Sequence, residues 1–392
     1  RVLLVFLGVG SVAATLAFPL VQFDALYHFA YKGKILFYSG DILDPAFTGS
    51  LERFGRIITH PNYPLGIPFL EAFAAHAGGA WDDRWVQIPV AFWAACLPAL
   101  AALGLRGVSP RAAARGALLL AAVPTLYTRK FFLTDGLGDL DVAAMNPLLL
   151  PGAGDLPLAC FLTAACALLL RARRGGSLLA GGLAGVFLAG AVLAKNEGLG
   201  LFGVLLMALF LGAPFCGRRA WKATALAAGM GILLSIPWLE HRRALPVIDE
   251  DYAHQFTLER MELFLTQPEE TLVTTLDTMK GSKKAEAATM RLPRIGEYFG
   301  IEFLDALNWG LLWLLFWGCL PSARLLRDPE FRWLALLVLG GLLLYALVML
   351  VTPWSLARLH TTGIPERLLV HLAGPAAILI GMRLRPAAAQ GA

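Results

Sequence analysis

Residues 154–198 read GDLPLACFLTAACALLLRARRGGSLLAGGLAGVFLAGAVLAKNEG. The apolar runs at 154–170 and 177–194 each have about the 17–25 residues that a helix needs to cross a bilayer. The link between them, at 171–174, contains three arginines, and a polar turn at 195–197 follows the second run. Short basic links are typical of the cytoplasmic side of membrane proteins. The segment therefore predicts a helical hairpin that crosses a membrane twice.

The same pattern of apolar runs continues through the chain. Hydrophobic residues make up 57% of the sequence and charged residues only 16%, against about 25% in soluble proteins. We expect an all-α polytopic membrane protein, with one transmembrane domain over residues 1–392. Residues 1–21 are interpreted as a retained span because no cleavage site follows them. The predicted spans are 1–21, 86–105, 112–127, 154–170, 177–194, 198–215, 221–239, 307–320, 333–351 and 367–382.

The distribution of charges predicts the orientation of these ten spans in the membrane. The links at 106–115, 171–174, 218–222 and 324–332 each carry three basic residues, whereas nearly all carboxylates fall on the other side. An eleventh span at 65–79 would break this pattern, so we interpret 65–79 as an interfacial helix. The outer loops are then 22–85, 128–153, 195–197, 240–306 and 352–366. The net charge of +5 reflects topology, and we expect no nucleic-acid partner.

The first outer loop contains a candidate base. If 24–38 is helical, Asp24, His28 and Lys32 share one face at i, i+4 and i+8. A carboxylate at the membrane surface, flanked by hydrogen-bond donors, is able to take a proton from an acceptor hydroxyl. A solvated face of an interfacial helix is the alternative interpretation, and spacing alone favours it.

Another part of this loop is a rigid turn. His60 and Tyr63 lie among the prolines of HPNYPLGIP, residues 60–68, which prevent a regular helix. Such a turn suits the binding of a phosphate or a sugar, or serves only as the entry into the next helix. Lys34 adds a further cation nearby.

Further polar candidates lie at the ends of apolar runs and in the second outer loop. Asp155 opens a span, where a carboxylate is costly and often functional, although helix capping is an equal alternative. Lys195 and Glu197 share a tight turn between two apolar runs, either as a functional pair or as an ion pair that closes a hairpin. Asp135, Asp139 and Asp141 weakly suggest oxygen ligands for a hard cation.

The last outer loop ends in a pair of candidate anion ligands. Pro365 suits a helix start, which places Arg367 and His371 one turn apart on one face. A guanidinium at the outer end of a span offers a planar fork for a phosphate group. Snorkelling to the interface is the alternative.

The ordered set of these motifs resembles the GT-C superfamily of membrane glycosyltransferases, which includes protein mannosyltransferases and aminoarabinose transferases of lipid A. The matching positions are Asp24, Tyr63-Pro64-Leu65, Asp155-Leu156-Pro157-Leu158, Lys195, Pro237-Trp238, Arg367 and Pro375. The chain lacks the Asp-Glu pair and lumenal domain of the mannosyltransferases, and the lysine and double proline of the aminoarabinose transferases. It therefore resembles a divergent bacterial branch.

The resemblance implies a GT-C-like bundle that transfers a sugar, with inversion, from a polyprenyl-phosphate donor to a glycan, lipid or protein acceptor. Asp24 would be the general base. Arg367, Lys195, Lys32, Lys34 and His60 would bind the donor phosphate, with support from Asp155, His28, Tyr63, Glu197 and His371. A divalent cation, Mg²⁺ or Mn²⁺, would involve Asp155 if one is used. The loop at 240–306 would bind the acceptor, and the active site would face the exterior of the cell inner membrane.

Two other classes of function stay open at this point. A transporter or flippase of a lipid-linked or anionic substrate would also carry charges in its spans, although here they gather at one face. A structural membrane subunit that binds a partner through 240–306 is the third class.

Overall fold

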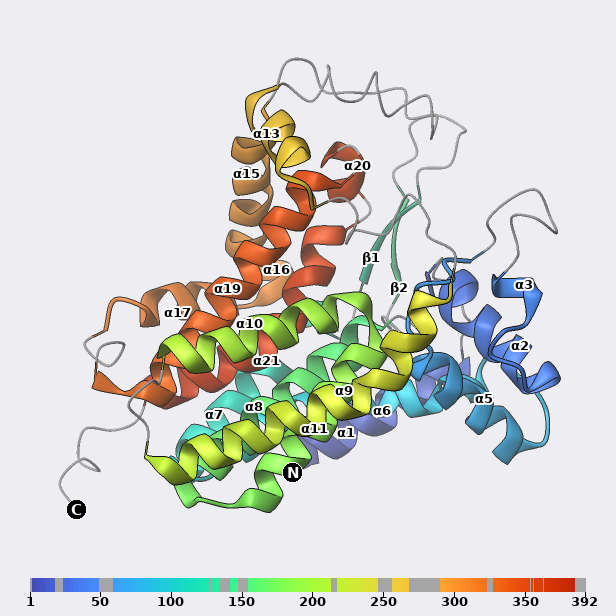
Figure 1. The fold of residues 1–392 in the computed structure, drawn as a ribbon. Helices are drawn as coiled ribbons and strands as arrows, with labels where there is room; N and C mark the ends of the chain where they lie inside the picture. Colours follow the sequence, from blue (N-terminus) through green and yellow to red (C-terminus); the bar gives the residue numbers. More distant parts are fainter. Residues whose placement is uncertain are drawn as a thin grey trace.

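The structure is a computed structural model of the 392-residue chain. It describes residues 2–17, 24–48, 59–126, 129–133, 142–146, 154–212, 217–245, 256–267, 290–322, 327–352, 354, 356–361 and 363–384. These residues form a bundle of apolar helices, with shorter helices gathered beyond one end of it (Figure 1).

Apolar helices overlap every predicted span. They are α1 (Val2–Ala17), α6 (Ile88–Leu105), α7 (Pro110–Ala121), α8 (Asp155–Gly175), α9 (Leu178–Ala194), α10 (Asn196–Gly212), α11 (Arg218–Arg243), α17 (Leu312–Cys319), α19 (Pro329–Val351) and α21 (Ile364–Arg383). Among the described residues, five helical segments are long and apolar enough to cross a membrane. The helical membrane class is thus supported, and the total of ten spans stays a prediction.

The segment predicted as one span at 307–320 is interrupted. It contains α16 (Ala306–Trp309), capped by the Asp305 carboxylate, and then α17. Gly310 lies between them with φ of 55°, a left-handed conformation that glycine adopts without the steric cost of a Cβ. The break therefore follows from the backbone at Gly310.

Helices α8 and α21 form the centre of the bundle, and nearly all of their side chains are buried. They approach closely at Gly374, where an added Cβ would lie 1.8 Å from the Thr163 hydroxyl oxygen. Helices α9 and α10 also approach closely at Gly198, where an added Cβ would lie 2.0 Å from the Ala191 carbonyl oxygen. Small residues allow such close packing in membranes, where the hydrophobic effect does not drive helices together.

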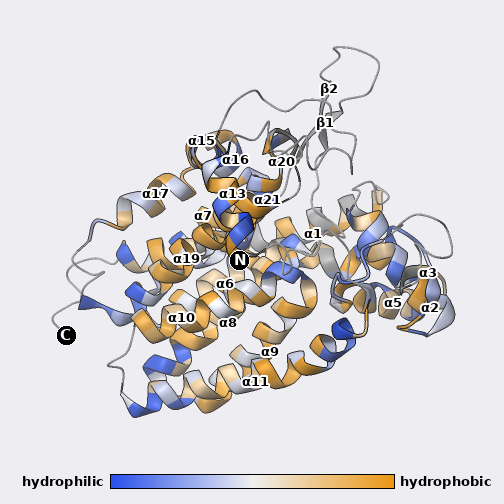
Figure 2. Cartoon of the chain, turned by 45° about the horizontal axis from the view of Figure 1, so that its top comes forward, coloured by the Kyte–Doolittle hydropathy of each residue, from blue (hydrophilic) through white to orange (hydrophobic). Residues whose placement is uncertain are grey.

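The hydropathy of the chain follows this arrangement. Apolar residues cover the bundle helices along most of their length, and hydrophilic residues gather at helix ends, as at both ends of α11 (Figure 2). This distribution matches the predicted placement of charges at the ends of spans.

Short helices of the first outer loop pack beside one end of the bundle. They are a π-helix, η1 (Ala25–Ala30), followed by α2 (Tyr31–Ser39), α3 (Pro45–Thr48) and α5 (Gly66–Gly78). The last of these is the helix predicted at 65–79. Phe69 and Phe73, one turn apart on α5, are both exposed, which suits a helix that lies on a membrane surface.

The contact between α2 and α5 encloses a carboxyl group. Glu71 is fully buried, and neither of its side-chain oxygens has a hydrogen-bond partner. A Cβ added to Gly33 would lie 2.9 Å from one of these oxygens, so the glycine makes room for the carboxyl. Burial, followed by the charge of Asp83, raises the pKa of Glu71 well above its ordinary value.

The outer loop at 128–153 contains a feature that the prediction did not include. Strands β1 (Arg129–Leu133) and β2 (Val142–Asn146) form an antiparallel pair in which Arg129 lies opposite Asn146. Pairing of the two strands satisfies the hydrogen-bonding groups of their backbones. Each strand has five residues, which is too short for a membrane span. The bundle itself is helical, as predicted.

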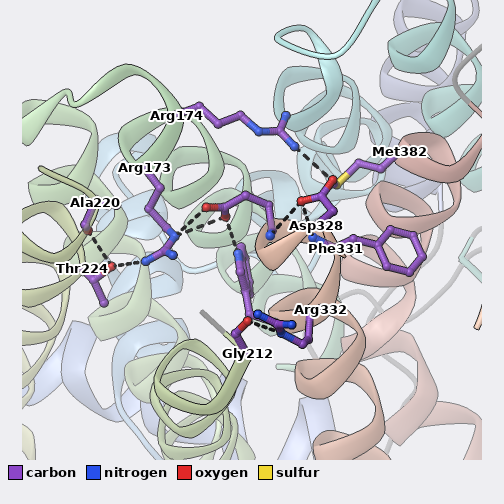
Figure 3. A network of polar contacts seen from close by, with 11 residues as sticks. Arg173, Arg174, Gly212, Ala220, Thr224, Asp328, Phe331, Arg332 and Met382 are labelled. Atoms are coloured by element: carbon purple, nitrogen blue, oxygen red, sulfur yellow. Dashed lines mark hydrogen bonds and ion pairs between the residues drawn. The ribbon is translucent and has the colours of Figure 1, made fainter. Parts of the chain in front are cut away.

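A polar network connects four helices at the end where α8 finishes (Figure 3). The Arg173 guanidinium donates to Glu330 at 3.0 Å and to the Thr224 hydroxyl at 2.8 Å. Arg332 donates to the Gly212 carbonyl, and the Trp333 indole donates to Glu330. Arg173, predicted only as a topology signal, is therefore a buried ion-pair partner that fixes α8, α11 and α19 together.

Candidate active site

Side chains from distant parts of the sequence meet at the opposite end of α8. Asp155 is the first residue of this helix, about 27 Å from Arg173 at 1.5 Å per residue. The N-cap position belongs to Gly154, so Asp155 is not the N-cap residue that one sequence interpretation suggested. Its carboxylate is fully buried and points to other helices instead.

The Asp155 carboxylate accepts hydrogen bonds from three side chains. Its Oδ1 accepts from Lys195 Nζ at 2.6 Å and from His371 Nε2 at 2.9 Å. Its Oδ2 accepts from Arg367 Nε at 2.9 Å. Asp155 is therefore the common anchor of a group of donors that arise from two other segments of the chain.

Lys195 reaches this anchor because α9 ends there. It is the C-cap residue of α9, is almost fully buried, and lies 3.0 Å from Glu197 in the first turn of α10. The close approach of α9 and α10 at Gly198 holds this turn. The polar turn at 195–197 is thus part of the same cluster as Asp155.

Arg367 and His371 lie one turn apart at the start of α21, as the sequence predicts. Because a carboxylate only accepts hydrogen bonds, His371 Nε2 carries the proton that it donates to Asp155. Nδ1 of His371 then accepts from the Tyr345 hydroxyl, 2.7 Å away on α19. Tyr345 was not identified from the sequence, where a tyrosine in the middle of an apolar run gives no signal of its partner.

Asp24 completes the cluster from the first outer loop. It immediately precedes η1, and its carboxylate forms an ion pair with the Arg367 guanidinium. Asp24 is partly exposed, whereas Asp155 is not. Burial opposes ionisation of Asp24, but the charges of Arg367 and Lys195 outweigh it and hold its pKa below the ordinary value.

We define the anion cluster as Asp24, Asp155, Lys195, Glu197, Arg367 and His371. It contains three carboxylates and two side chains that are cationic at neutral pH. The charged groups alternate, so each cation contacts two carboxylates. Such a site supplies both a carboxylate for proton transfer and cations for an anionic group.

A group of aromatic rings adjoins the cluster. The ring centroids of His28 and His60 lie 4.4 Å apart, and that of Tyr63 lies 5.0 Å from His28. Burial, followed by the charge of His60, lowers the pKa of His28 to about 3, so its ring is neutral. His28 lies four residues after Asp24 within η1, which brings the rings beside the cluster. These rings offer an apolar surface with polar edges beside the cluster.

Lys32 binds the backbone of the turn at 60–63. Its ammonium is buried and donates to the backbone carbonyls of His60, Pro61 and Tyr63 at 2.6, 3.1 and 2.9 Å. Lys32 therefore holds the rigid turn at 60–63 in place. Lys34 is exposed on α2, and its side chain makes no hydrogen bond or ion pair in the described part of the chain.

The described residues do not fit a metal ion. Both oxygens of Asp155, the expected ligand, already accept from cationic or N–H donors, which would oppose a bound cation. Within the ranges given above, no group of three or more His, Cys, Asp or Glu side chains is placed to hold a metal. Asp135, Asp139 and Asp141 lie outside the described residues.

Comparison with known proteins identifies the fold. No family model and no curated protein matches the sequence. The oligosaccharyltransferase of Archaeoglobus fulgidus, tethered to an acceptor peptide, matches 97% of this chain and 49% of its own, with 15% identity and a TM-score of 0.55. The chain shares its fold with this enzyme.

The same archaeal enzyme in complex with an inhibitory peptide and a dolichol-phosphate matches 97% of this chain and 50% of its own, with 12% identity and a TM-score of 0.50. ArnT from Cupriavidus metallidurans bound to undecaprenyl phosphate covers 97% of this chain and 77% of its own, at 17% identity and a TM-score of 0.45. The chain spans about half the length of the archaeal enzyme.

Proposed function

We propose that the protein is a glycosyltransferase that moves a sugar from a polyprenyl-phosphate donor to an acceptor hydroxyl. The observation that carries the proposal is the convergence of Asp24, Asp155, Lys195 and Arg367 at one end of a GT-C fold. The archaeal neighbour was solved with a dolichol-phosphate, which supports a lipid-phosphate donor for this chain as well.

The reaction follows from the charges of the cluster. Asp24 accepts the proton of the acceptor hydroxyl, whose oxygen forms a bond to the anomeric carbon. The bond between that carbon and the phosphate oxygen breaks, and polyprenyl phosphate leaves with one additional negative charge. A single displacement inverts the anomeric centre. No other reactant is required.

Two cationic side chains stabilise the negative charge that develops on the leaving phosphate. Arg367 presents a planar guanidinium and Lys195 an ammonium, and Asp155 holds both in fixed positions from its buried side. Groups that are already oriented need no reorganisation during the reaction, which is the main source of their effect on rate. We assign Asp155 as a positioning residue and Tyr63, His28 and His60 as the neighbouring sugar surface.

The membrane orientation supports an outward-facing site. The basic links at 171–174 and 218–222 lie at the ends of α8 and α11 away from the cluster. Under the positive-inside rule, the cluster then faces the exterior of the inner membrane. The loop at 240–306 is our candidate for acceptor binding, and its α15 (Arg291–Leu304) is anchored at its first residue, where Arg291 donates to carbonyls at the end of α19.

Transfer of radiolabelled sugar tests this function directly. Purified protein in vesicles, supplied with a labelled polyprenyl-phosphate sugar and a membrane extract, should form a labelled product that no longer partitions with the lipid donor. Asp24→Asn should lose nearly all transfer while inserting normally. Movement of the intact donor across the bilayer without a new covalent product would instead identify a flippase.

A further inference from the structure

The Arg367 guanidinium lies between two carboxylates that differ in burial and in their number of partners. Its Nε and Nη2 both lie 2.9 Å from Asp155 Oδ2, and Nη2 also contacts Asp24 Oδ2. Asp155 is buried and accepts from two further side chains, whereas Asp24 is partly exposed. Asp155 thus holds the edge of Arg367 formed by Nε and Nη2, and Asp24, which lies nearer to solvent, makes the second contact of Nη2.

This arrangement conflicts with both tasks that the proposed reaction gives to these residues. A carboxylate that is paired with a guanidinium has a low affinity for protons and is a weak base. A guanidinium whose Nη2 already contacts two carboxylates cannot present its full fork to a phosphate. Lys195 does not resolve the conflict, because Asp155 and Glu197 already hold it.

We propose that the donor phosphate replaces Asp24 on Arg367, so that Asp24 becomes available as a base only when the donor is bound. The inference rests on the function proposed above. The phosphate oxygen takes the hydrogen-bonding position on Nη2, so Arg367 keeps an anionic partner there when Asp24 leaves it. Asp24, released from its partner, gains affinity for the acceptor proton.

Asp24 is the carboxylate that exchanges because its attachment is the weaker of the two. Asp155 accepts from Arg367, Lys195 and His371 and is closed to water, so its removal from Arg367 would leave a buried charge. Asp24 immediately precedes the π-helix η1, and such helices are short, rare and frequently found at functional sites. The consequence is an ordered reaction in which the donor binds before the acceptor is deprotonated.

Binding of a polyprenyl phosphate that carries no sugar tests the exchange. If Asp24 competes with phosphate for Arg367, Asp24→Asn should bind the lipid phosphate about tenfold to a hundredfold more tightly than the parent, the range for losing one competing charge-assisted hydrogen bond. The same variant should transfer no sugar. Asp41→Asn is the matched control, since it removes one exposed carboxylate beyond α2 and should leave the affinity within about twofold.

A double-mutant cycle shows whether the gain passes through Arg367. In an Arg367→Gln background, Asp24→Asn should no longer raise the affinity. An equal gain in both backgrounds would mean general charge repulsion and would overturn the exchange. Asp24→Ala, checked for the parental elution volume, provides a second measurement of the same gain.

The outcomes separate this inference from the function on which it rests. A parent that binds lipid phosphate and transfers sugar, with a variant Asp24→Asn of unchanged affinity, overturns the exchange alone. A parent that neither binds the lipid phosphate nor transfers sugar overturns the proposed function. A phosphate-free polyprenol, used as a probe in parallel, should show no gain in either variant.

Discussion

Replacing Asp155 by asparagine should both destabilise the protein and stop transfer. The change keeps the size of the side chain but removes the charge that holds Arg367, Lys195 and His371. Removing one partner of a buried ion pair costs about 3–5 kcal/mol, because the remaining charge stays buried without compensation. Asp24 and Glu197 still neutralise part of the two cations, so we expect about 3 kcal/mol, the lower end of this range.

Unfolding in mixed micelles and sugar transfer are the two measurements. Asp328→Asn is the matched control: the same chemical change at the N-cap of α19, at the other end of the bundle, should cost less than about 1 kcal/mol, because asparagine caps a helix about as well as aspartate, and should leave transfer intact. Adding Lys195→Met to Asp155→Asn should restore part of the stability, because one uncompensated cation is removed, but no transfer. If Asp155→Asn were no less stable than Asp328→Asn and transferred sugar at the parental rate, the reasoning would be refuted.

Three further predictions concern the surroundings of the cluster. Gly374→Ala should destabilise by about 1–3 kcal/mol through overpacking and lower transfer by moving α21 from α8. Thr163→Ala in the same chain removes the hydroxyl and methyl groups but keeps the Cβ, so it should restore part of both, as measured by unfolding and transfer assays. Tyr345→Phe should leave Nδ1 of His371 without its donor, reducing transfer several-fold at a cost of about 1–3 kcal/mol; an unchanged rate would exclude a positioning role. The pKa of Glu71 is raised in the folded state, so the folded state keeps a proton that the unfolded state loses above the ordinary pKa of 4.5. The free energy of unfolding should therefore fall as the pH rises from that value through the pKa of the folded state. Glu71→Gln should flatten this part of the pH profile of unfolding, and an unaltered profile would assign the dependence to another group.

The sequence predicted the helices well because the bilayer imposes a length on them. Apolar runs such as 154–170 and 333–351 are read directly from composition, and α8 and α19 confirm them. The pairing of Arg367 with His371 on one face also followed from sequence, since a helix brings residues four apart together. Local periodicity is sufficient for features of this kind.

Local periodicity does not predict that Asp24, Asp155 and Arg367 contact one another. The number of residues between them does not define which helices pack together, so the sequence supplied the members but not their contacts. Lys32 shows the same limit, since its helical position did not reveal that its ammonium would bind three backbone carbonyls. The ion pair of Arg173 with Glu330, and the contact of Tyr345 with His371, likewise depend on packing between distant segments.

Three helices begin at the anion cluster, since Asp155 opens α8, Glu197 lies in the first turn of α10, and Arg367 lies in the first turn of α21. The aligned peptide dipoles of each helix place about half a positive charge at its N-terminus. The backbone therefore contributes a positive field that no substitution of a side chain removes. In a chain that lacks Arg367 or Lys195, this field still offsets part of the charge of the three carboxylates, so the loss of affinity in these variants measures only what the side chains add to it.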